Sequence, residues 1–285
     1  MSRRAVLITG ATGFLGGRLA ERLLAAGWEV WGLRRPTSRG GPKDVRWMEV
    51  KRGESPLPDR PLDAIVHAAT CYGRRGESLR AVLEANLLLP VGLLEAALHR
   101  EVPRLINIDT VLPPSLNAYT RSKAQFREWG RAIARGGSTT LTNLQLDYFY
   151  GPGEPCERFI PSVIAACLRN EGEIPLTSGE QRRSLLHVED AVAGIVATLE
   201  APGLSPGDYH LCEAEPPPLR TVIETIRRMT GSTTSLEFGR LPRRGGEPLA
   251  PGPRGRSLAE LGWRPAVPLE TGLQQAIDWV REQCV

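Results

Sequence analysis

The sequence predicts an α/β fold in which a mainly parallel sheet lies between layers of helices. The apolar run at residues 5–8 is too short for a helix and is typical of a strand buried on both faces. In the segment 15–23 that follows, leucines recur every four residues, as on one face of a helix. Further short apolar runs at residues 29–33, 64–66 and 104–108 fit the other strands of such a sheet. This order of strands and helices is typical of a doubly wound sheet.

The length and composition fit a globular protein without an extended basic surface. The 285 residues suffice for one large α/β domain, or for one such domain with a smaller lobe. The net charge is +4, but the chain has only three lysines, and its arginines are spread along the sequence. No basic stripe with interleaved aromatic residues is present, so we do not expect binding to nucleic acids. The arginines fit better as clamps on the phosphates of small ligands.

The cysteines and the apolar segments predict the compartment. The five cysteines, at positions 71, 156, 167, 212 and 284, are scattered and include no C-x-x-C pair. We therefore expect reduced thiols, with neither a disulfide framework nor a metal site. No apolar stretch approaches the roughly 18 residues needed to span a bilayer, and the apolar segment after Arg4 is too short for the core of a signal peptide. These observations predict a cytoplasmic protein with no membrane partner.

Three glycines lie between the first predicted strand and the first predicted helix. Their spacing is G-x-x-G-x-x-G, and Gly27 ends the helix. A strand, a glycine turn and a helix in this order direct backbone N–H groups and the positive end of the helix at a pyrophosphate. The segment therefore predicts a dinucleotide site. Its predicted contacts are Gly10, Thr12, Gly13, Phe14, Leu15 and Gly16.

The end of the second predicted strand indicates which dinucleotide binds. A site for NAD places Asp or Glu here, where the carboxylate bonds the ribose 2′-hydroxyl. This chain has Arg34-Arg35 instead. Guanidinium groups pair with a 2′-phosphate, so we predict NADPH, with Arg34, Arg35 and Ser38 around that phosphate.

A tyrosine and a lysine four residues apart follow the strand at 104–108. This spacing puts Tyr119 and Lys123 on one face of a helix, and Lys123 is informative because nearly every other basic residue is arginine. A compact ammonium can hold the nicotinamide ribose and lower the pKa of the tyrosine. We therefore predict that Tyr119 is the general acid for a carbonyl and that the Thr110 hydroxyl stabilises its oxygen.

These motifs together resemble the extended short-chain dehydrogenases/reductases, a family of Rossmann-type α/β proteins. Thr9 to Gly16 resembles T-G-x-x-G-F-[LI]-G, and residues 144–153 resemble R-x-x-x-x-Y-G-P-G, with Gln145 in place of the arginine. The resemblance implies that the H-A-A segment runs beside the cofactor. It adds Ala68, Ala69, Thr70, Tyr119, Lys123 and Tyr148 to the predicted cofactor contacts. We interpret His67 and Asn86 as structural residues.

Two positions depart from the pattern of the family. The family usually has Ser-Ser or Ser-Thr where this chain has Asp109-Thr110, so Thr110 must supply the hydroxyl. Thr110 and Tyr119 are nine positions apart, which is closer than extended members generally show.

Within the family, the chain is most similar to nucleotide-sugar 4-ketoreductases such as CDP-abequose and CDP-paratose synthases. The similar stretches include residues 69–74, 108–119 and 175–183, and the segment 244–248 matches R-x-G-[ED]-x-P. The resemblance implies that Arg183 and Arg244 bind a nucleotide diphosphate. The predicted substrate contacts are Tyr72, Thr110, Phe159, Thr177, Arg183 and Arg244.

The resemblance also implies a second, discontinuous substrate-binding lobe toward the C-terminus. We expect the dinucleotide domain at residues 1–153, with 184–210 returning to it, and the lobe at 154–183 and 211–285. A homodimer is expected only because the family commonly dimerises.

The leading hypothesis is an NADPH-dependent reduction of the keto group, at C4, of a nucleotide-activated 4-keto-6-deoxyhexose. A nucleotide-sugar 4-epimerase is the alternative, but epimerases recycle NAD, and Arg34 favours NADPH. A dehydratase commonly has Asp-Glu directly after the threonine, where this chain has Val111-Leu112. A catalytically silent NADPH sensor would not need Thr110, Tyr119 and Lys123 together.

Overall fold

The structure, a computed structural model, describes residues 3–51, 53–212, 215–250 and 255–285. The chain forms two compact units. Unit 1 consists of residues 1–146, 192–211 and 253–263, and unit 2 of residues 147–191, 212–252 and 264–285. These boundaries differ from the expected ones: residues 147–153 and 184–191 group with unit 2, and 253–263 with unit 1.

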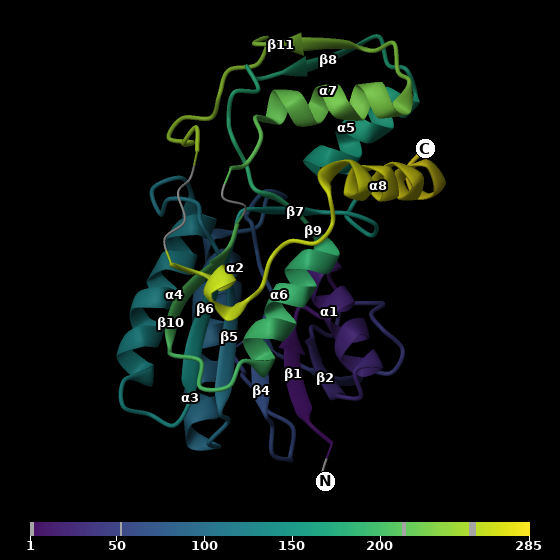
Figure 1. Cartoon of the computed structure of the whole chain (residues 1–285). Coiled ribbons are helices and arrows are strands. Elements are labelled where there is room, and N and C mark those ends of the chain that lie inside the picture. The colour runs from purple at the N-terminus through teal and green to yellow at the C-terminus, as the bar shows by residue number, and fades with distance from the viewer. Residues whose placement is uncertain (1–2, 52, 213–214, 251–254) are drawn as a thin grey trace. The chain divides into compact units, whose positions relative to one another are not determined.

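Unit 1 is built on an eight-stranded sheet in which all strand pairs are parallel. The strand order is β12-β10-β6-β5-β4-β1-β2-β3 (Figure 1). The strands are β1 (Ala5–Thr9), β2 (Glu29–Arg34), β3 (Arg46–Glu49), β4 (Ala64–His67), β5 (Arg104–Thr110), β6 (Thr140–Leu146), β10 (Gly207–Leu211) and β12 (Arg256–Ser257). The predicted doubly wound α/β fold is confirmed.

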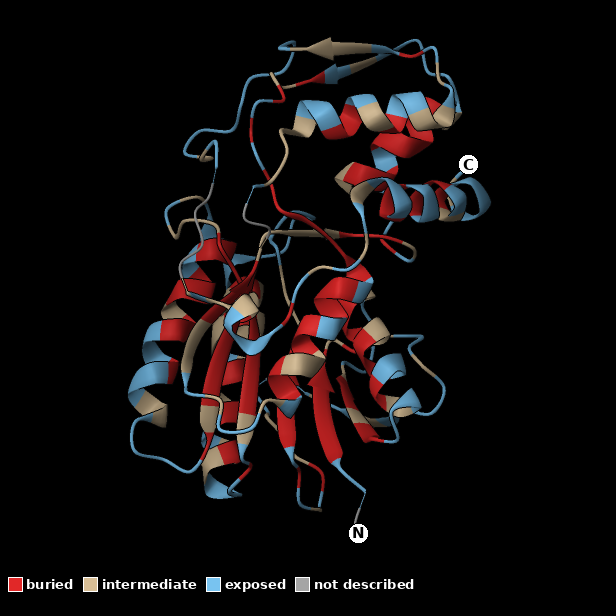
Figure 2. Cartoon of the chain, viewed as in Figure 1, coloured by how far each residue is buried: buried red, intermediate tan, exposed pale blue. Residues whose placement is uncertain are grey.

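Helices connect the strands of unit 1 and cover its sheet. They are α1 (Phe14–Ala25), α2 (Leu79–Leu83), η1 (Glu84–Leu88), α3 (Leu89–His99), α4 (Ala118–Ala134), η2 (Leu258–Leu261) and α6 (Val188–Glu200), whose first turn groups with unit 2. The chain runs from β1 to β2 in one direction along the sheet and from β4 to β6 in the other. Right-handed crossovers therefore place α1 on one face and α3 and α4 on the other. Figure 2 shows the central strands as mainly buried, as expected for strands covered on both faces.

One helical stretch corrects the expectation that no segment is long and apolar enough to cross a membrane. Residues 79–99, which are α2, η1 and α3 in succession, form 21 continuous helical residues with a mean hydropathy of 1.6 in an 18-residue window. The same stretch buries Val82, Asn86, Leu93 and Leu94, and it packs against α4. The helix is apolar because it covers the sheet of unit 1, and we interpret it as a core helix.

Unit 2 is a smaller α/β unit with two short parallel strand pairs. β7 (Tyr148–Tyr150) pairs with β9 (Leu185–His187), and β8 (Glu173–Leu176) pairs with β11 (Ser235–Phe238). The helices α5 (Phe159–Leu168), α7 (Leu219–Thr230) and α8 (Leu269–Gln283) enclose its core. That core includes Ile160, Ile223 and Ile277, one from each helix.

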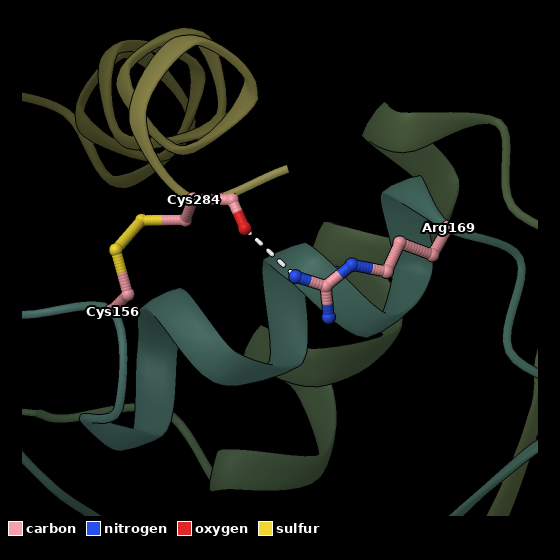
Figure 3. Close-up of a disulfide and its surroundings, with 3 residues drawn as sticks. All are labelled: Cys156, Arg169 and Cys284. Atoms are coloured by element: carbon pink, nitrogen blue, oxygen red, sulfur yellow. Dashed lines mark hydrogen bonds between the residues drawn. A yellow bond between two sulfur atoms is a disulfide. The ribbon is translucent and has the colours of Figure 1, made fainter.

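The expectation that all cysteines are reduced is wrong for one pair. Cys156 and Cys284, which are 128 positions apart in the sequence, form a disulfide in unit 2 with their Cα atoms 5.8 Å apart (Figure 3). Arg169 also donates to the Cys284 carbonyl oxygen at 2.7 Å, so the chain after α8 is fixed at two points. No motif in the sequence indicates this pairing, because the fold alone brings the two positions together. Cys71, Cys167 and Cys212 are free thiols.

Candidate functional site

The glycine turn between β1 and α1 has the close backbone approach that a dinucleotide site needs. Gly10 has a φ of +73°, and a Cβ atom there would lie 2.7 Å from the Ala69 nitrogen. A Cβ atom on Gly16 would lie 2.2 Å from the Gly10 carbonyl oxygen, so α1 approaches the turn too closely for any side chain. Gly13 is the N-cap of α1 and contributes no side-chain cap. The backbone at the start of this helix therefore fits a pyrophosphate.

The H-A-A segment meets this turn as predicted. β1 and β4 are neighbours with Thr9 opposite His67, and the Thr9 hydroxyl accepts a hydrogen bond from the Ala69 N–H at 3.1 Å. Ala68, Ala69 and Thr70 are half-buried directly beyond the carboxyl end of β4. The other predicted contacts lie on the turn and the first turn of α1: Thr12, Phe14 and Leu15. The two segments fit one dinucleotide along the carboxyl ends of adjacent strands.

The two arginines after the second strand differ in how they are held. Arg34 ends β2, opposite Glu49 of β3, and its guanidinium carbon lies 5.3 Å from the ring centroid of Trp47. Arg35 is exposed, and its carbonyl oxygen accepts from the Ser38 N–H at 2.9 Å. Within the described part of the chain, neither arginine forms an ion pair with a carboxylate. Both therefore fit a phosphate ligand.

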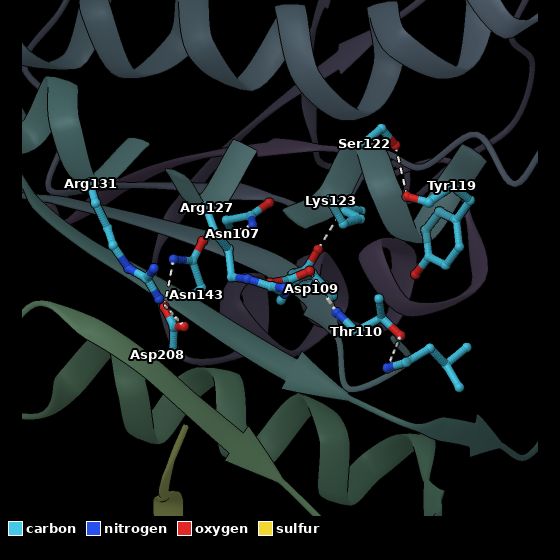
Figure 4. A network of polar contacts seen from close by, with 12 residues as sticks. Asn107, Asp109, Thr110, Tyr119, Ser122, Lys123, Arg127, Arg131, Asn143 and Asp208 are labelled. Atoms are coloured by element: carbon cyan, nitrogen blue, oxygen red, sulfur yellow. Dashed lines mark hydrogen bonds and ion pairs between the residues drawn. The ribbon is translucent and has the colours of Figure 1, made fainter. Parts of the chain in front are cut away.

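Helix α4 carries the predicted catalytic pair at its first turns. Its N-cap, Asn117, accepts from the Thr120 N–H at 3.0 Å, and the Thr120 hydroxyl accepts from the Asn117 N–H at 3.2 Å. This capping box fixes where the helix begins and thus which residues face β5. Tyr119 and Lys123 lie on that buried face. The Lys123 ammonium donates to the Ile108 carbonyl oxygen at 2.8 Å (Figure 4).

The short connection between Thr110 and Tyr119 does bring their hydroxyls together. The phenol of Tyr119 points toward the Thr110 side chain in Figure 4, and Thr110 acts to lower the pKa of Tyr119. Tyr72 packs on Tyr119 with ring centroids 4.9 Å apart. Burial raises the pKa of Tyr119 well above its usual value, and Tyr72 and Asp109 raise it further. The phenol is therefore protonated at neutral pH, as a general acid must be.

The pKa of Tyr119 changes in the opposite direction to the one that the sequence suggested. We expected its charge to lower the pKa of the tyrosine, but burial and the neighbouring groups have the larger effect and raise it. Burial also lowers the pKa of Lys123 to about 8, although Asp109 opposes that change. Near neutral pH, Lys123 is thus mostly protonated and able to bind an acceptor.

His67 and Asn86 are buried and contact residues that adjoin the glycine turn and α4, which fits the structural role expected of them. His67 is fully buried with its Nδ1 2.9 Å from the Thr9 hydroxyl, and burial holds its pKa well below the usual value. The Asn86 amide donates to the Cys71 carbonyl oxygen at 2.8 Å and to the Ser122 hydroxyl at 3.1 Å. Asn86 lies in the π-helical segment η1, and it ties the H-A-A strand end to α4.

In unit 2 the two predicted arginine segments meet through a glutamate. Arg183 is buried and donates to Glu247 at 2.7 Å and to the Pro248 carbonyl oxygen at 3.1 Å. Arg244 is exposed, at the start of the turn that carries Glu247. Asp147 accepts from the Ser184 N–H at 2.9 Å, and burial raises the pKa of Asp147 to about 6 against the effect of Arg183. Arg183 thus contacts the segment that carries Arg244 through Glu247 and Pro248, and both of these partners belong to the protein.

Tyr148 belongs to a buried polar cluster in unit 2. Its hydroxyl donates to Glu154 at 2.7 Å, and the Arg158 guanidinium lies 3.2 Å from the same carboxylate. Burial raises the pKa of Glu154 to about 7, and Arg158 opposes the rise. Of the other predicted substrate contacts in this unit, Phe159 is half-buried at the start of α5, and the Thr177 hydroxyl accepts from the Gln181 amide at 2.8 Å.

Sequence reasoning missed several residues that hold these groups. Asp109 was noticed only as a departure from serine, yet it forms a buried ion pair with Arg127 at 2.5 Å. Gln145, opposite Asp109 in the β5–β6 ladder, is fully buried and lines a cavity of about 270 Å³ with Arg127. Arg127 lies four positions after Lys123, so the helical spacing could have indicated it. No comparable signal exists for Glu154.

The comparisons with known proteins agree with this arrangement. Residues 6–212 match the NAD dependent epimerase/dehydratase family. The chain belongs to this family. The matched segment includes both the glycine turn and the Tyr119–Lys123 pair.

Similar members of the NAD dependent epimerase/dehydratase family include reductases and epimerases. The chain is 26% identical to CDP-abequose synthase of Salmonella typhimurium, over 95% of this chain and 97% of that protein. It is 25% identical to dTDP-4-dehydro-6-deoxy-D-allose reductase of Streptomyces bikiniensis, over 98% and 96% of the two chains. The fold is similar to that of UDP-glucuronic acid 4-epimerase from Bacillus cereus, solved with UDP-glucuronic acid and NAD. The TM-score is 0.83 at 21% identity, over 98% and 99% of the two chains.

Proposed function

We propose that this protein is an NADPH-dependent reductase of the keto group, at C4, of a nucleotide-activated 4-keto-6-deoxyhexose. The observation that carries the proposal is the protonated Tyr119, which points toward Thr110 and lies one helical turn from Lys123. Two relatives that align over nearly the whole chain, CDP-abequose synthase and the dTDP-sugar reductase, bear the names of enzymes that make nucleotide-linked deoxysugars.

Each residue has a separate part in this reduction. A bound reduced dinucleotide supplies the hydride. Thr110 donates a hydrogen bond to the substrate oxygen, and Tyr119 transfers its phenolic proton to that oxygen as the carbonyl becomes an alcohol. Lys123 holds the nicotinamide ribose and stabilises the phenolate that Tyr119 leaves behind. Solvent then returns the proton to Tyr119.

The proposed cofactor is NADPH because Arg34 and Arg35 lie where a site for NAD has a carboxylate. Trp47 packs against the Arg34 guanidinium and limits its freedom, which favours a bidentate contact with a 2′-phosphate. The proposed substrate contacts are Tyr72 and Thr110 in unit 1, and Phe159, Thr177, Arg183 and Arg244 in unit 2. The two arginines would meet the diphosphate.

The deciding experiment is a panel of CDP-, dTDP-, UDP- and GDP-linked 4-keto-6-deoxy sugars, with NADPH consumption and product configuration as readouts. We expect stoichiometric loss of NADPH with at least one of them. Tyr119→Phe should lower kcat by roughly 10²–10⁴-fold and leave NADPH binding within about threefold. Tyr209→Phe, which removes the hydroxyl that donates to the Ser205 carbonyl oxygen, is the matched control and should change neither value.

Two results would overturn the proposal. Interconversion of 4-hydroxy sugars without net loss of NADPH would identify an epimerase. Unchanged turnover in Tyr119→Phe would refute the assignment of Tyr119 as the general acid.

The cofactor is tested by the affinities of wild type and Arg34→Asp for NADPH and NADH. Wild type should prefer NADPH and the variant should lose about 10-fold or more of that preference, whereas a wild type that prefers NADH excludes the phosphate site.

A further inference from the structure

Three consecutive residues at the end of β5 each face a residue of α4. The Tyr119 phenol points toward Thr110 (Figure 4), the Ile108 carbonyl oxygen accepts from the Lys123 ammonium, and Asp109 pairs with Arg127. The three helix residues are spaced by four and therefore lie in one stripe on successive turns. Figure 4 shows this stripe facing the strand end. The Asp109–Arg127 pair is thus continuous with the two residues proposed to act on the substrate.

Both members of the pair are buried, and both oxygens of Asp109 are engaged. One oxygen accepts from the Thr110 backbone N–H at 2.8 Å, and the other accepts from Arg127 at 2.5 Å. The exposed fraction of the Arg127 side chain is 9%, and that of Asp109 is zero. Because the first contact fixes the backbone of Thr110, a shift of Asp109 moves the hydroxyl that Tyr119 contacts.

The next turn of α4 gives a useful contrast. Arg131 pairs with Asp208, and Asp208 accepts from Asn143 at 3.0 Å, but the exposed fraction of Arg131 is 55%. This second pair lies one turn farther from Tyr119, on the edge of the same polar network (Figure 4). It has the same chemistry as the first pair, without contact to Thr110 or Lys123 among the described residues.

We infer that Asp109 and Arg127 are positioning residues for the reduction, which together hold the Thr110 backbone and the Lys123 ammonium in the arrangement that Tyr119 requires. This inference rests on the proposed function. Asp109 directly follows Ile108, whose carbonyl oxygen accepts from the Lys123 ammonium, so the carboxylate is next in the chain to the residue that binds Lys123. Arg127 binds this carboxylate and partly offsets its charge.

The charges around Lys123 determine what loss of the pair should do. Lys123 faces Asp109 from β5, Arg127 and Tyr119 from its own helix, and His67 from β4. After burial, Asp109 has the largest effect on the pKa of Lys123 and raises it, and Arg127 has a smaller, opposite effect. Asp109→Asn should therefore lower the pKa of Lys123 by about one unit or more. The double variant Asp109→Asn/Arg127→Gln should lower it less, because the opposing cation is also gone.

The test uses the full chain with NADP⁺ bound and reads Lys123 directly by NMR of isotopically labelled lysine. The chain has only three lysines, so the Lys123 signal can be assigned by its disappearance in Lys123→Arg. The titration midpoint of Lys123 should be highest in wild type, lower in the double variant and lowest in Asp109→Asn. The alkaline limb of the kcat profile should shift to lower pH in the same order, and kcat near pH 8 should fall about fivefold or more in Asp109→Asn. Arg131→Gln, the matched control, should leave both profiles unchanged.

The outcomes separate the two proposals. A wild type that reduces no keto sugar refutes the proposed function, while the lysine titration still tests the pair. If Lys123 titrates identically in folded wild type, Asp109→Asn and the double variant, the positioning role is wrong. Circular dichroism and thermal melting identify folded variants. If Asp109→Asn does not fold, the double variant, in which the buried Arg127 charge is also removed, decides the question alone.

Discussion

Two buried carboxylates, Asp109 in unit 1 and Glu154 in unit 2, each lie beside an arginine and beside a hydroxyl of a candidate site. Asp109 uses both of its oxygens, and its partner Arg127 is buried with it. Glu154 accepts from Tyr148 with one oxygen, and its other oxygen has no hydrogen-bond partner in the part of the chain that the structure describes. The exposed fraction of its partner Arg158 is 27%.

The difference lies in how many groups engage each carboxylate. Burial raises the pKa of both carboxylates, and an arginine opposes the rise in each case. For Asp109, two acceptor contacts and the second cation, Lys123, also oppose the rise. For Glu154, the opposing contributions are fewer, and its pKa rises to about 7. Unit 1 thus holds a carboxylate engaged at both oxygens, and unit 2 holds a group that titrates near neutral pH.

The largest expected difference is the response to losing the arginine. Arg127→Met leaves Asp109 buried without its partner, which should lower the free energy of unfolding by about 3–5 kcal/mol. Arg158→Met should lower it by about 1 kcal/mol or less, because Arg158 is partly solvated and Glu154 can take up a proton. Chemical denaturation of both variants near pH 7 measures the difference. Equal losses would show that the two carboxylates are held alike.

The disulfide of unit 2 should have the next largest effect. Cys156 lies two positions after Glu154, so the bond to Cys284 constrains the loop that carries this carboxylate. Cys284→Ser should lower stability by about 2–4 kcal/mol, since a long loop is no longer closed in the unfolded chain. Hydrogen exchange should localise the loss to α5 and α8, with the sheet of unit 1 unaffected.

Two controls test the assignment of that loss to the bond. Cys71→Ser removes a free thiol in unit 1 and should leave α5 and α8 protected. A thiol reductant should destabilise wild type as much as Cys284→Ser does, and it should not destabilise the variant further. A wild type that is indifferent to the reductant contradicts the role given to the bond.

The sequence was sufficient for the features whose spacing is local. The glycine turn and Arg34 lie at strand ends, and the Tyr119–Lys123 pair lies on the helix that follows β5, so periodicity and spacing alone indicate their elements. The parallel sheet followed from the same alternation of short apolar runs and helices. The structure confirms these strands and helices of unit 1, and the roles of the residues on them stay predictions.

The groups that hold those residues could not be inferred in the same way. Cys156 and Cys284 meet only because the whole of unit 2 folds between them, and no spacing rule covers such a distance. Helical spacing could place Arg127 on the same face as Lys123, but it could not indicate the buried pairing of Arg127 with Asp109 of β5. Asp109 looked like a departure from a motif, and its partner became evident only from the packing of α4 on the sheet.

The pH dependence of stability gives the smallest and most specific test of the comparison. Glu154 has a pKa of about 7 in the folded chain against 4.5 for an ordinary glutamate, so between these values the folded state binds a proton that the unfolded state has released. The contribution of Glu154 to stability must therefore fall as pH rises from about 4.5 to 7, and Asp147, with a pKa of about 6, adds a change of the same sign. Glu154→Gln removes its own contribution and should stabilise the protein by about 1–3 kcal/mol at pH 8, with little gain at pH 4.5. Asp109→Asn should destabilise the protein at both values, because Arg127 then lacks a partner. Denaturation midpoints of Glu154→Gln and Asp109→Asn between pH 4.5 and 8 test this difference. If both variants gain stability, or neither does, the unpaired oxygen of Glu154 does not distinguish it from Asp109.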